Sequence, residues 1–146
     1  MSKFKKSFHI KGRDFIRAGE ASINVQNLLK SMDFDSRLIR RVAICGYESE
    51  MNVVMHGGDG SLSLEVDTDR LTLEISDDGP GIEDIDLAMQ AGYSTAEDAD
   101  REMGFGAGMG LPNMKKNADR INIESKRSQG TIVQMIFFLP EGGKTD

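Results

Sequence analysis

A glycine-rich segment that opens into a helix is the strongest chemical signal in this chain. Its glycines stand at four alternate positions, Gly104, Gly106, Gly108 and Gly110. Leu111 follows, and then Pro112, whose fixed φ suits the first turn of a helix. Glycine lets backbone N–H groups approach a ligand closely, and the free N–H groups of a helix N-terminus attract anions. We expect a phosphate-binding loop here. The alternative is a flexible connector, although connectors are seldom followed by an amphipathic helix.

The spacing of this segment excludes the two commonest phosphate loops. No Gly-x-x-x-x-Gly-Lys-Ser/Thr sequence occurs in the chain, so there is no P-loop. A dinucleotide-binding loop requires a strand directly before its first glycine. The stretch Ser94–Glu102 is instead polar and without a period. A third type of nucleotide site therefore has to be considered.

Asp77 is a candidate ligand-binding carboxylate because of its place in a predicted strand. The apolar residues of that strand alternate: Leu71, Leu73 and Ile75. Asp77 falls on the same side, facing the core, where a carboxylate needs a hydrogen-bonding partner. A ligand that offers an N–H donor is one such partner. The alternative is that the strand has already ended and Asp77 caps a turn with Asp78 and Gly79, and the residues alone leave both open.

Two polar residues on one predicted helix form a second candidate group. Glu48 and Asn52 are four apart and share a face, so they are candidates for a general base and a metal ligand. The alternative is a solvated polar face. Glu50 points about 200° away from Glu48 by the helical period and is the weaker candidate. His56 extends the face as a helix-end hydrogen-bonding group, and Cys45 is expected to serve packing.

The predicted elements group into helices and hairpin-like strands. Helices are expected at residues 15–32, capped by Asp14, from Asp35 or Ser36 to Met55, and at 112–119. Strands are expected around residues 4–10, 61–66, 71–75, 121–125 and 131–139. Thr131 begins the inward row of the last strand, where its hydroxyl serves a ligand or the neighbouring backbone. The grouping predicts an α+β fold with helices on one face of a mostly antiparallel sheet.

Length and charge bound the function. The chain has 146 residues and a net charge of −6, which predicts one domain over residues 1–146 and argues against nucleic acid or an anionic membrane as partner. Cys45 is the single cysteine, and no stretch is long and apolar enough for a membrane span or a signal peptide. We expect a cytoplasmic protein.

Four motifs in order resemble those of the Bergerat-fold ATPases, the superfamily of DNA gyrase, heat-shock chaperones, histidine kinases and mismatch-repair ATPases. The motifs are Glu48-Ser-Glu-Met-Asn52, Asp77-Asp-Gly-Pro-Gly81, the segment from Gly104 to Leu111, and Gly130-Thr131. The resemblance covers roughly residues 35–139. It implies a two-layer α/β sandwich with helices on one face of a mixed, mostly antiparallel sheet.

The resemblance also implies a role for each motif residue. Asn52 would coordinate the Mg²⁺ that bridges the phosphates of ATP, and Glu48 would act as the base for the attacking hydroxyl. Asp77 would bind the adenine amino group, with Thr131 close to the base. Other contacts to ATP or ADP would come from the residues Gly79, Gly81, Gly104, Gly106, Gly108, Gly110 and Leu111. The polar segment at about residues 84–107 would form a lid over ATP, with Arg101 near the terminal phosphate.

Within the superfamily the chain is similar to the anti-sigma-factor serine/threonine kinases and the related small switch kinases, which carry Glu-x-x-x-Asn followed by His-Gly. This resemblance implies an ATP-dependent kinase that phosphorylates a small antagonist protein, regulates transcription or signalling by partner switching, binds a sigma factor or other regulator, and forms a homodimer. Two features depart from the pattern: the lid is acidic, and Gly-Ala-Gly-Met-Gly-Leu is closer to histidine and switch kinases. The alternatives are a non-catalytic ATP-binding module and a relative that binds no nucleotide.

Overall fold

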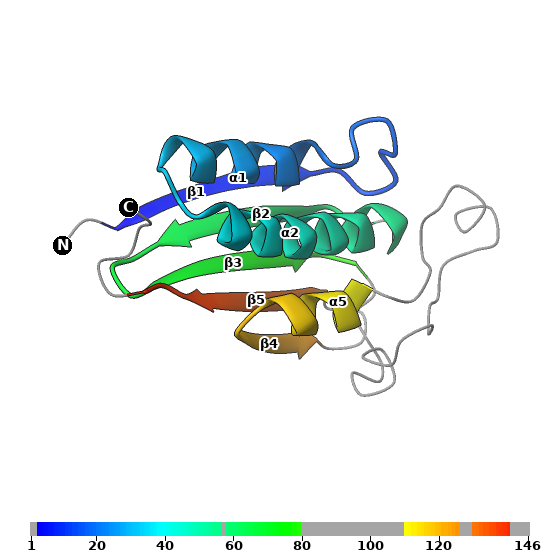
Figure 1. The fold of residues 1–146 in the computed structure, drawn as a ribbon. Coiled ribbons are helices and arrows are strands. Elements are labelled where there is room, and N and C mark those ends of the chain that lie inside the picture. The colour runs from blue at the N-terminus through cyan, green and yellow to red at the C-terminus, as the bar shows by residue number, and fades with distance from the viewer. Residues whose placement is uncertain (1–2, 57, 80–109, 126–129, 141–146) are drawn as a thin grey trace.

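A five-stranded sheet with helices on one face forms the fold (Figure 1). The computed structural model describes residues 3–56, 58–79, 110–125 and 130–140. The strands are β1 (Phe4–Ile10), β2 (Gly60–Val66), β3 (Arg70–Asp77), β4 (Arg120–Ser125) and β5 (Thr131–Phe138). They lie in the order β1-β2-β3-β5-β4, so the last strand is inserted between β3 and β4. Each of these pairings is antiparallel, which confirms the α+β class; the sheet expected to be mixed is antiparallel throughout its described pairs.

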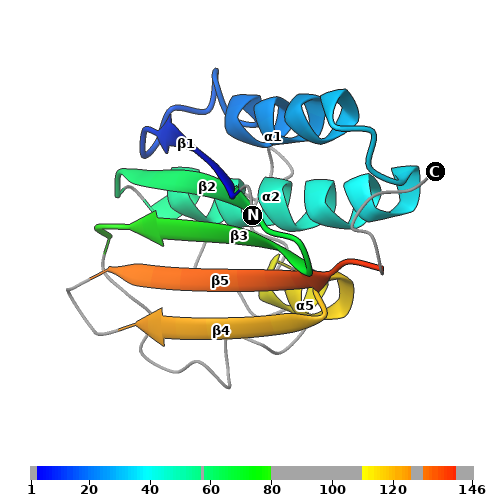
Figure 2. The ribbon, with the colours of Figure 1, turned by 90° about the vertical axis from the view of Figure 1, so that its left-hand side faces the viewer.

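Three described helices pack against the same side of this sheet: α1 (Glu20–Ser31), α2 (Ser36–His56) and α5 (Gly110–Asn117). Figure 1 shows all three in front of the strands, and Figure 2, from another side, shows α2 and α5 behind them. The core lies between the two layers, and side chains from both are fully buried, among them Leu29, Val42, Leu64, Leu73, Met114 and Phe137. None of the described helices combines the length and the apolar character that crossing a bilayer requires.

The period-2 and period-3.6 patterns predicted most of these elements within one or two residues. Strands β2 and β3 form the expected hairpin, in which Leu62 lies opposite Ile75 and Leu64 opposite Leu73. Helix α2 begins at Ser36, where the Asp35 side chain accepts a hydrogen bond from the N–H of Arg37 at 3.3 Å. That carboxylate is a local cap of the kind that the sequence predicted.

The predicted start of the first helix is wrong. Helix α1 begins at Glu20, not at residue 15, and its N-cap is Gly19 at φ +100°. Asp14 instead accepts a hydrogen bond from the N–H of Arg17 at 3.3 Å within the preceding loop. The residues before Gly19 therefore belong to a turn, and the helix takes its cap from another part of the chain.

Glu50 of α2 supplies that cap. Its Oε2 accepts hydrogen bonds from the N–H groups of Gly19 at 2.9 Å and Ala21 at 3.3 Å. Its Oε1 accepts one from the N–H of Ser22 at 2.9 Å. The side chain is only 2% exposed. Glu50 thus faces away from Glu48, as its helical angle predicted, and its carboxylate satisfies the free donors and the positive end of the α1 dipole.

Candidate functional site

Asp77 is the last residue of β3 and is paired on both sides. The register places it opposite Thr131 of β5 and opposite Gly60 of β2. The strand therefore extends through Asp77, which confirms that its side chain continues the inward row. Its Oδ1 also accepts a hydrogen bond from the N–H of Gly79 at 2.9 Å. The two alternatives that the sequence left open thus coexist: a strand residue that also closes a turn.

The charge state of Asp77 is set by its half-buried position. Burial raises the pKa of the carboxyl above its usual range. The N–H of Gly79, the nearby His56 and the N–H of Thr131 lower the pKa without cancelling this effect, and Asp78 adds to the rise. A further N–H donor would favour the ionised form. An adenine amino group is a donor of this kind.

Glycines allow the backbone segments around Asp77 to approach one another. Gly130, just before Thr131, has φ +84°, and a Cβ there would overlap the carbonyl oxygen of Asp77. A Cβ on Gly58 would lie 2.6 Å from the N atom of Gly79. Any side chain at these two positions would force the loops that surround Asp77 apart.

Thr131 lies beside Asp77 but already has a hydroxyl partner. It is 9% exposed, and its Oγ1 lies 2.8 Å from the Oγ of Ser125 on β4. The Ser125 hydroxyl also donates to the carbonyl oxygen of Gly130 at 3.2 Å. Ser125 was not predicted as part of this region, because only the antiparallel pairing of β4 with β5 places it opposite Thr131.

Helix α5 brings the end of the glycine-rich segment against Asn52. The helix begins at Gly110, two residues earlier than predicted. A Cβ on Gly110 would lie 3.2 Å from both the Oδ1 and the Nδ2 of Asn52. The side chain of Leu111 is 6% exposed and packs in the core, so its backbone is the part that can contact a phosphate. The α5 N-terminus and Asn52 therefore border the same space.

Glu48 lies one turn before Asn52 on α2. Its side chain contacts Asn113 of α5, three residues after Gly110. The Nδ2 of Asn113 donates a hydrogen bond to its Oε1 at 3.5 Å. Burial raises the pKa of the Glu48 carboxyl, and the bond from Asn113 lowers it in part. Asn113 was not predicted from the sequence as a residue of this site. Its only signal is an amide between Leu111 and Met114, two residues expected to face the core.

The two groups of predicted residues meet at one end of the molecule. In Figure 1 the end of α2, the end of β3 and the start of α5 lie at the same end, and the effect of His56 on Asp77 agrees with this arrangement. The structure describes the predicted residues Glu48, Asn52, Asp77, Gly79, Gly110, Leu111 and Thr131. The other predicted residues lie outside the described part of the chain: Gly81, Gly104, Gly106, Gly108, Arg101 and the lid at about residues 84–107.

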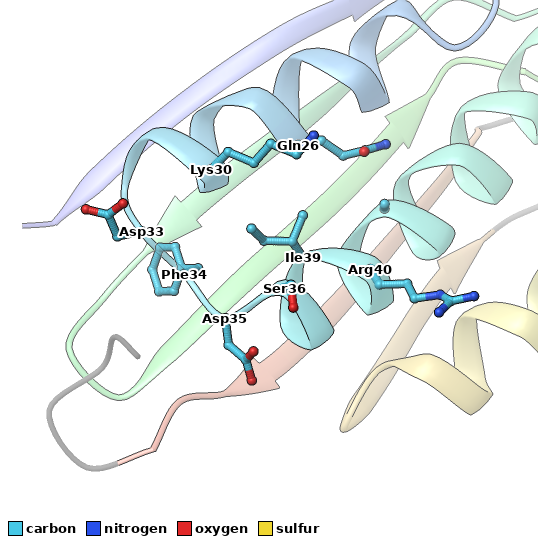
Figure 3. Close-up of a pocket in the computed structure, with 9 residues that line it drawn as sticks. Gln26, Lys30, Asp33, Phe34, Asp35, Ser36, Ile39 and Arg40 are labelled. Carbon is cyan, nitrogen blue, oxygen red and sulfur yellow. The ribbon is translucent and has the colours of Figure 1, made fainter. Parts of the chain in front are cut away.

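A groove on the outer surface of the helical layer is separate from this region. It has a volume of about 830 Å³ and lies between α1 and α2, around the turn that joins them. Figure 3 shows Lys30 and Gln26 on the α1 side, Arg40 on the α2 side and Ile39 between them. None of the predicted site residues that the structure describes lines it.

Comparison with known proteins identifies the family. Residues 43–142 match the model of the histidine kinase-, DNA gyrase B- and HSP90-like ATPases. The chain belongs to this ATPase family. The matched range includes all the motif residues from Glu48 to Thr131, and the match confirms the resemblance inferred from the four motifs.

The curated proteins to which the chain is similar include a serine/threonine-protein kinase and anti-sigma F factors. The chain is 30% identical over 118 residues to the serine/threonine-protein kinase RsbT of Bacillus subtilis, covering 78% of this chain and 83% of that protein. It is 30% identical over 104 residues to the anti-sigma F factor of a Thermoanaerobacter species, covering 71% and 65%. It is 29% identical over 120 residues to the anti-sigma F factor of Clostridium acetobutylicum, covering 79% and 80%.

Proposed function

We propose that this protein is an ATP-dependent serine/threonine protein kinase that phosphorylates a small antagonist protein and regulates transcription or signalling by partner switching. The placement of Glu48 and Asn52 on successive turns of α2, facing the first turns of α5, carries the proposal. This is the arrangement of a base and a metal ligand next to a phosphate-binding helix start. Kinase and anti-sigma relatives in the same ATPase family support it.

The residues at this end of the molecule fit ATP. A half-buried carboxylate with a raised pKa, Asp77, is suited to an adenine amino donor. A Cβ on Gly79 would lie 3.1 Å from the Oδ1 of Asp77, so the glycine at this position leaves space beside the carboxylate. The N-terminus of α5 at Gly110 would face the phosphates. Asp77 would thus bind the base, and the N-terminus of α5 would bind the phosphates.

The residues also fit Mg²⁺ bound mainly through phosphate and water. Among the described residues no group of three or more His, Cys, Asp or Glu side chains is arranged to hold a metal ion. Asn52 offers a single amide oxygen, and Mg²⁺ commonly takes one or two protein ligands and fills its other positions with water and phosphate oxygens. When bound, the ion neutralises charge that develops on the phosphates.

In the proposed reaction, Glu48 orients the acceptor hydroxyl and takes its proton. The acceptor oxygen forms a bond to the γ-phosphorus as the bond between that phosphorus and the bridging oxygen of ADP breaks, and ADP leaves with the electron pair. Burial suits Glu48 to this role, because its raised pKa makes it a stronger base than an exposed carboxylate. Asn52 would hold the Mg²⁺ ion beside the phosphates.

We also propose where this kinase acts and which proteins it binds. We place it in the cytoplasm, with an antagonist protein as substrate and a sigma factor or another regulator as a second partner. Homodimer formation and closure of the predicted lid also stay predictions.

The test compares substitutions of two glutamates. The purified protein is titrated with ATP in a calorimeter, with and without Mg²⁺, and incubated with radiolabelled ATP and each small antagonist protein of the same genome. Glu48→Ala should retain ATP binding and lose phosphate transfer. Glu74→Ala should change neither, because Glu74 alternates with Leu73 and Ile75 and so points to the opposite face of the sheet.

Two outcomes would contradict the kinase assignment. A wild-type protein that binds ATP but phosphorylates none of the antagonists is a non-catalytic module whose partner binding follows the nucleotide. A protein that binds neither ATP nor ADP would refute both functions.

A further inference from the structure

One face of α2 makes a continuous set of contacts with α5 and the residues that follow it. Its members recur at intervals of four, three and four residues, which is the spacing of one helical face. They are Arg41, Cys45, Glu48 and Asn52. The Nε of Arg41 donates to the carbonyl oxygen of Asn117 at 2.9 Å, and the Sγ of Cys45 lies 3.6 Å from the carbonyl oxygen of Met114. Glu48 meets the side chain of Asn113, and Asn52 lies against Gly110.

These contacts fix α5 at both ends. Arg41 holds its last residue, Asn117, and also forms an ion pair with Asp119 at 3.0 Å. At the other end Gly110 lies against Asn52. The buried side chain of Met114 anchors the middle of the helix in the core. The backbone that carries Asn113 is therefore held in place on a rigid element.

Asn113 is the described residue that gives a side-chain hydrogen bond to Glu48. A glutamate has three side-chain torsions, so an untethered carboxylate samples many orientations. A donor on Oε1 fixes the carboxylate plane and leaves Oε2 free for a proton. The separation of 3.5 Å is long, as is common for catalytic hydrogen bonds before substrate binds.

The type of donor also matters. A lysine or arginine at this position would hold the carboxylate with a full positive charge and weaken it as a base. A neutral amide orients the carboxylate and leaves most of its basicity intact. Asparagine thus combines a short, rigid reach with a modest electrostatic effect.

We propose that Asn113 is a positioning residue for Glu48, holding Oε1 so that Oε2 faces the hydroxyl that attacks the γ-phosphate. This inference rests on the proposed kinase function. The transfer step itself is unchanged: Oε2 takes the proton, the new oxygen–phosphorus bond forms and ADP departs. Asn113 touches neither ATP nor the acceptor and acts through Glu48.

The first test is kinetic and uses water as the acceptor, so that it needs no identified substrate protein. Release of inorganic phosphate from MgATP is measured for the wild type, Asn113→Leu, Asn113→Gln and the control Asn117→Leu. Asn113→Leu keeps the side-chain size and removes the donor, and it should lower kcat about tenfold with KM for ATP within about twofold. Asn113→Gln restores an amide donor and should recover part of kcat.

Asn117→Leu controls for damage to α5. The Asn117 side chain donates to the carbonyl oxygen of Asn113 at 2.8 Å on the same helix, and no described bond joins it to Glu48. Its kcat should stay within about twofold of the wild type, because α5 is held by other contacts. Equal losses in the Asn113→Leu and Asn117→Leu variants, or a loss for Asn113→Leu that falls on KM, would overturn the positioning role.

The second test does not depend on turnover. The urea midpoint of unfolding is measured for Asn113→Leu, Glu48→Leu and the double variant. If the two side chains interact, the shift caused by Asn113→Leu should largely disappear when Glu48 is already leucine. Additive shifts would show that the contact has no energetic effect and would overturn the inference alone. A wild type without phosphate release or transfer would overturn the kinase function, whatever the result of this cycle.

Discussion

Glu48 and Glu50 lie two residues apart on α2 and are predicted to affect stability in opposite directions. Glu50 is buried, and its carboxylate accepts hydrogen bonds from the N–H groups of Gly19, Ala21 and Ser22. Replacing Glu50 with alanine removes these bonds and leaves donors at the α1 N-terminus without their partner. Replacing it with glutamine keeps the shape of the side chain but leaves one acceptor oxygen instead of two. The amide NH₂ that takes the place of the other oxygen cannot accept a hydrogen bond from the N–H group that it faces.

The magnitude follows from the number of bonds. Hydrogen bonds to charged groups contribute about 1.5–3 kcal/mol each, and a buried donor without a partner costs about 1–3 kcal/mol. In Glu50→Ala, water would bind some of the N–H groups at the α1 N-terminus and recover part of this loss. We therefore expect Glu50→Ala to lower the free energy of unfolding by about 3–5 kcal/mol. Glu50→Gln should lower it by about 1–2 kcal/mol. A typical domain is stable by about 5–15 kcal/mol, so the glutamine variant remains folded and measurable.

Urea unfolding followed by circular dichroism gives these values, and Glu48→Gln is the matched control. Burial raises the pKa of the Glu48 carboxyl, so the folded protein binds its proton more tightly than the unfolded chain does. Stability therefore falls as the pH rises above the ordinary pKa of glutamate, and the loss is complete once the pH exceeds the folded pKa. Glu48→Gln should be as stable as the wild type or more stable at neutral pH, and the difference should vanish below the ordinary pKa of glutamate.

Amide exchange locates the effect. Glu50→Gln should speed exchange at Ala21 and Ser22 and leave the strands unchanged. A Glu50→Gln variant with wild-type stability, or one whose exchange rises evenly across the protein, would refute the capping role. Equal destabilisation by Glu48→Gln would refute the contrast between the two glutamates.

Three further predictions concern the candidate site. Asp77→Asn should weaken ATP binding in calorimetry while raising stability at neutral pH, since burial raises the pKa of Asp77 in the fold; unchanged affinity would contradict the adenine contact. Asn52→Ala should abolish the gain in ATP affinity that Mg²⁺ gives the wild type, so that adding EDTA has no further effect; a retained gain would place the metal ligand elsewhere. Gly130→Ala should lower the free energy of unfolding by about 1–3 kcal/mol or more, because Gly130 has φ +84° and a Cβ would overlap the Asp77 carbonyl; a neutral effect in thermal unfolding would contradict this geometry.

The sequence predicted those features whose causes are local. The start of α2 depends on Asp35, one residue before it, and the inward row of β3 depends on the alternation of its own residues. The place of Asp77 follows from that alternation, and the pairing with Thr131 makes it a shared site of two strands. Four ordered motifs then identified the ATPase family, which the comparison with known proteins confirmed.

The features that were missed depend on contacts between distant segments. The cap of α1 comes from Glu50, which is 31 residues from Gly19, so the local carboxylate of Asp14 was the wrong choice. Asn113 and Glu48 are 65 residues apart and meet only because α5 packs along α2. Periodicity assigns each residue to a face of its own element but does not say which face of another element it will meet.

The insertion of β5 between β3 and β4 has a consequence for the order of assembly during synthesis. A nascent chain that has emerged only as far as β4 has an unpaired edge on β3, because the neighbour of β3 in the sheet is β5, which follows β4 in the chain. Such an edge is open to pairing with other chains. The strand that closes it also brings Thr131 beside Asp77. The proposed nucleotide site is thus completed by the same event that pairs the β3 edge, and a chain synthesised only as far as β4 has neither this pairing nor Thr131 beside Asp77.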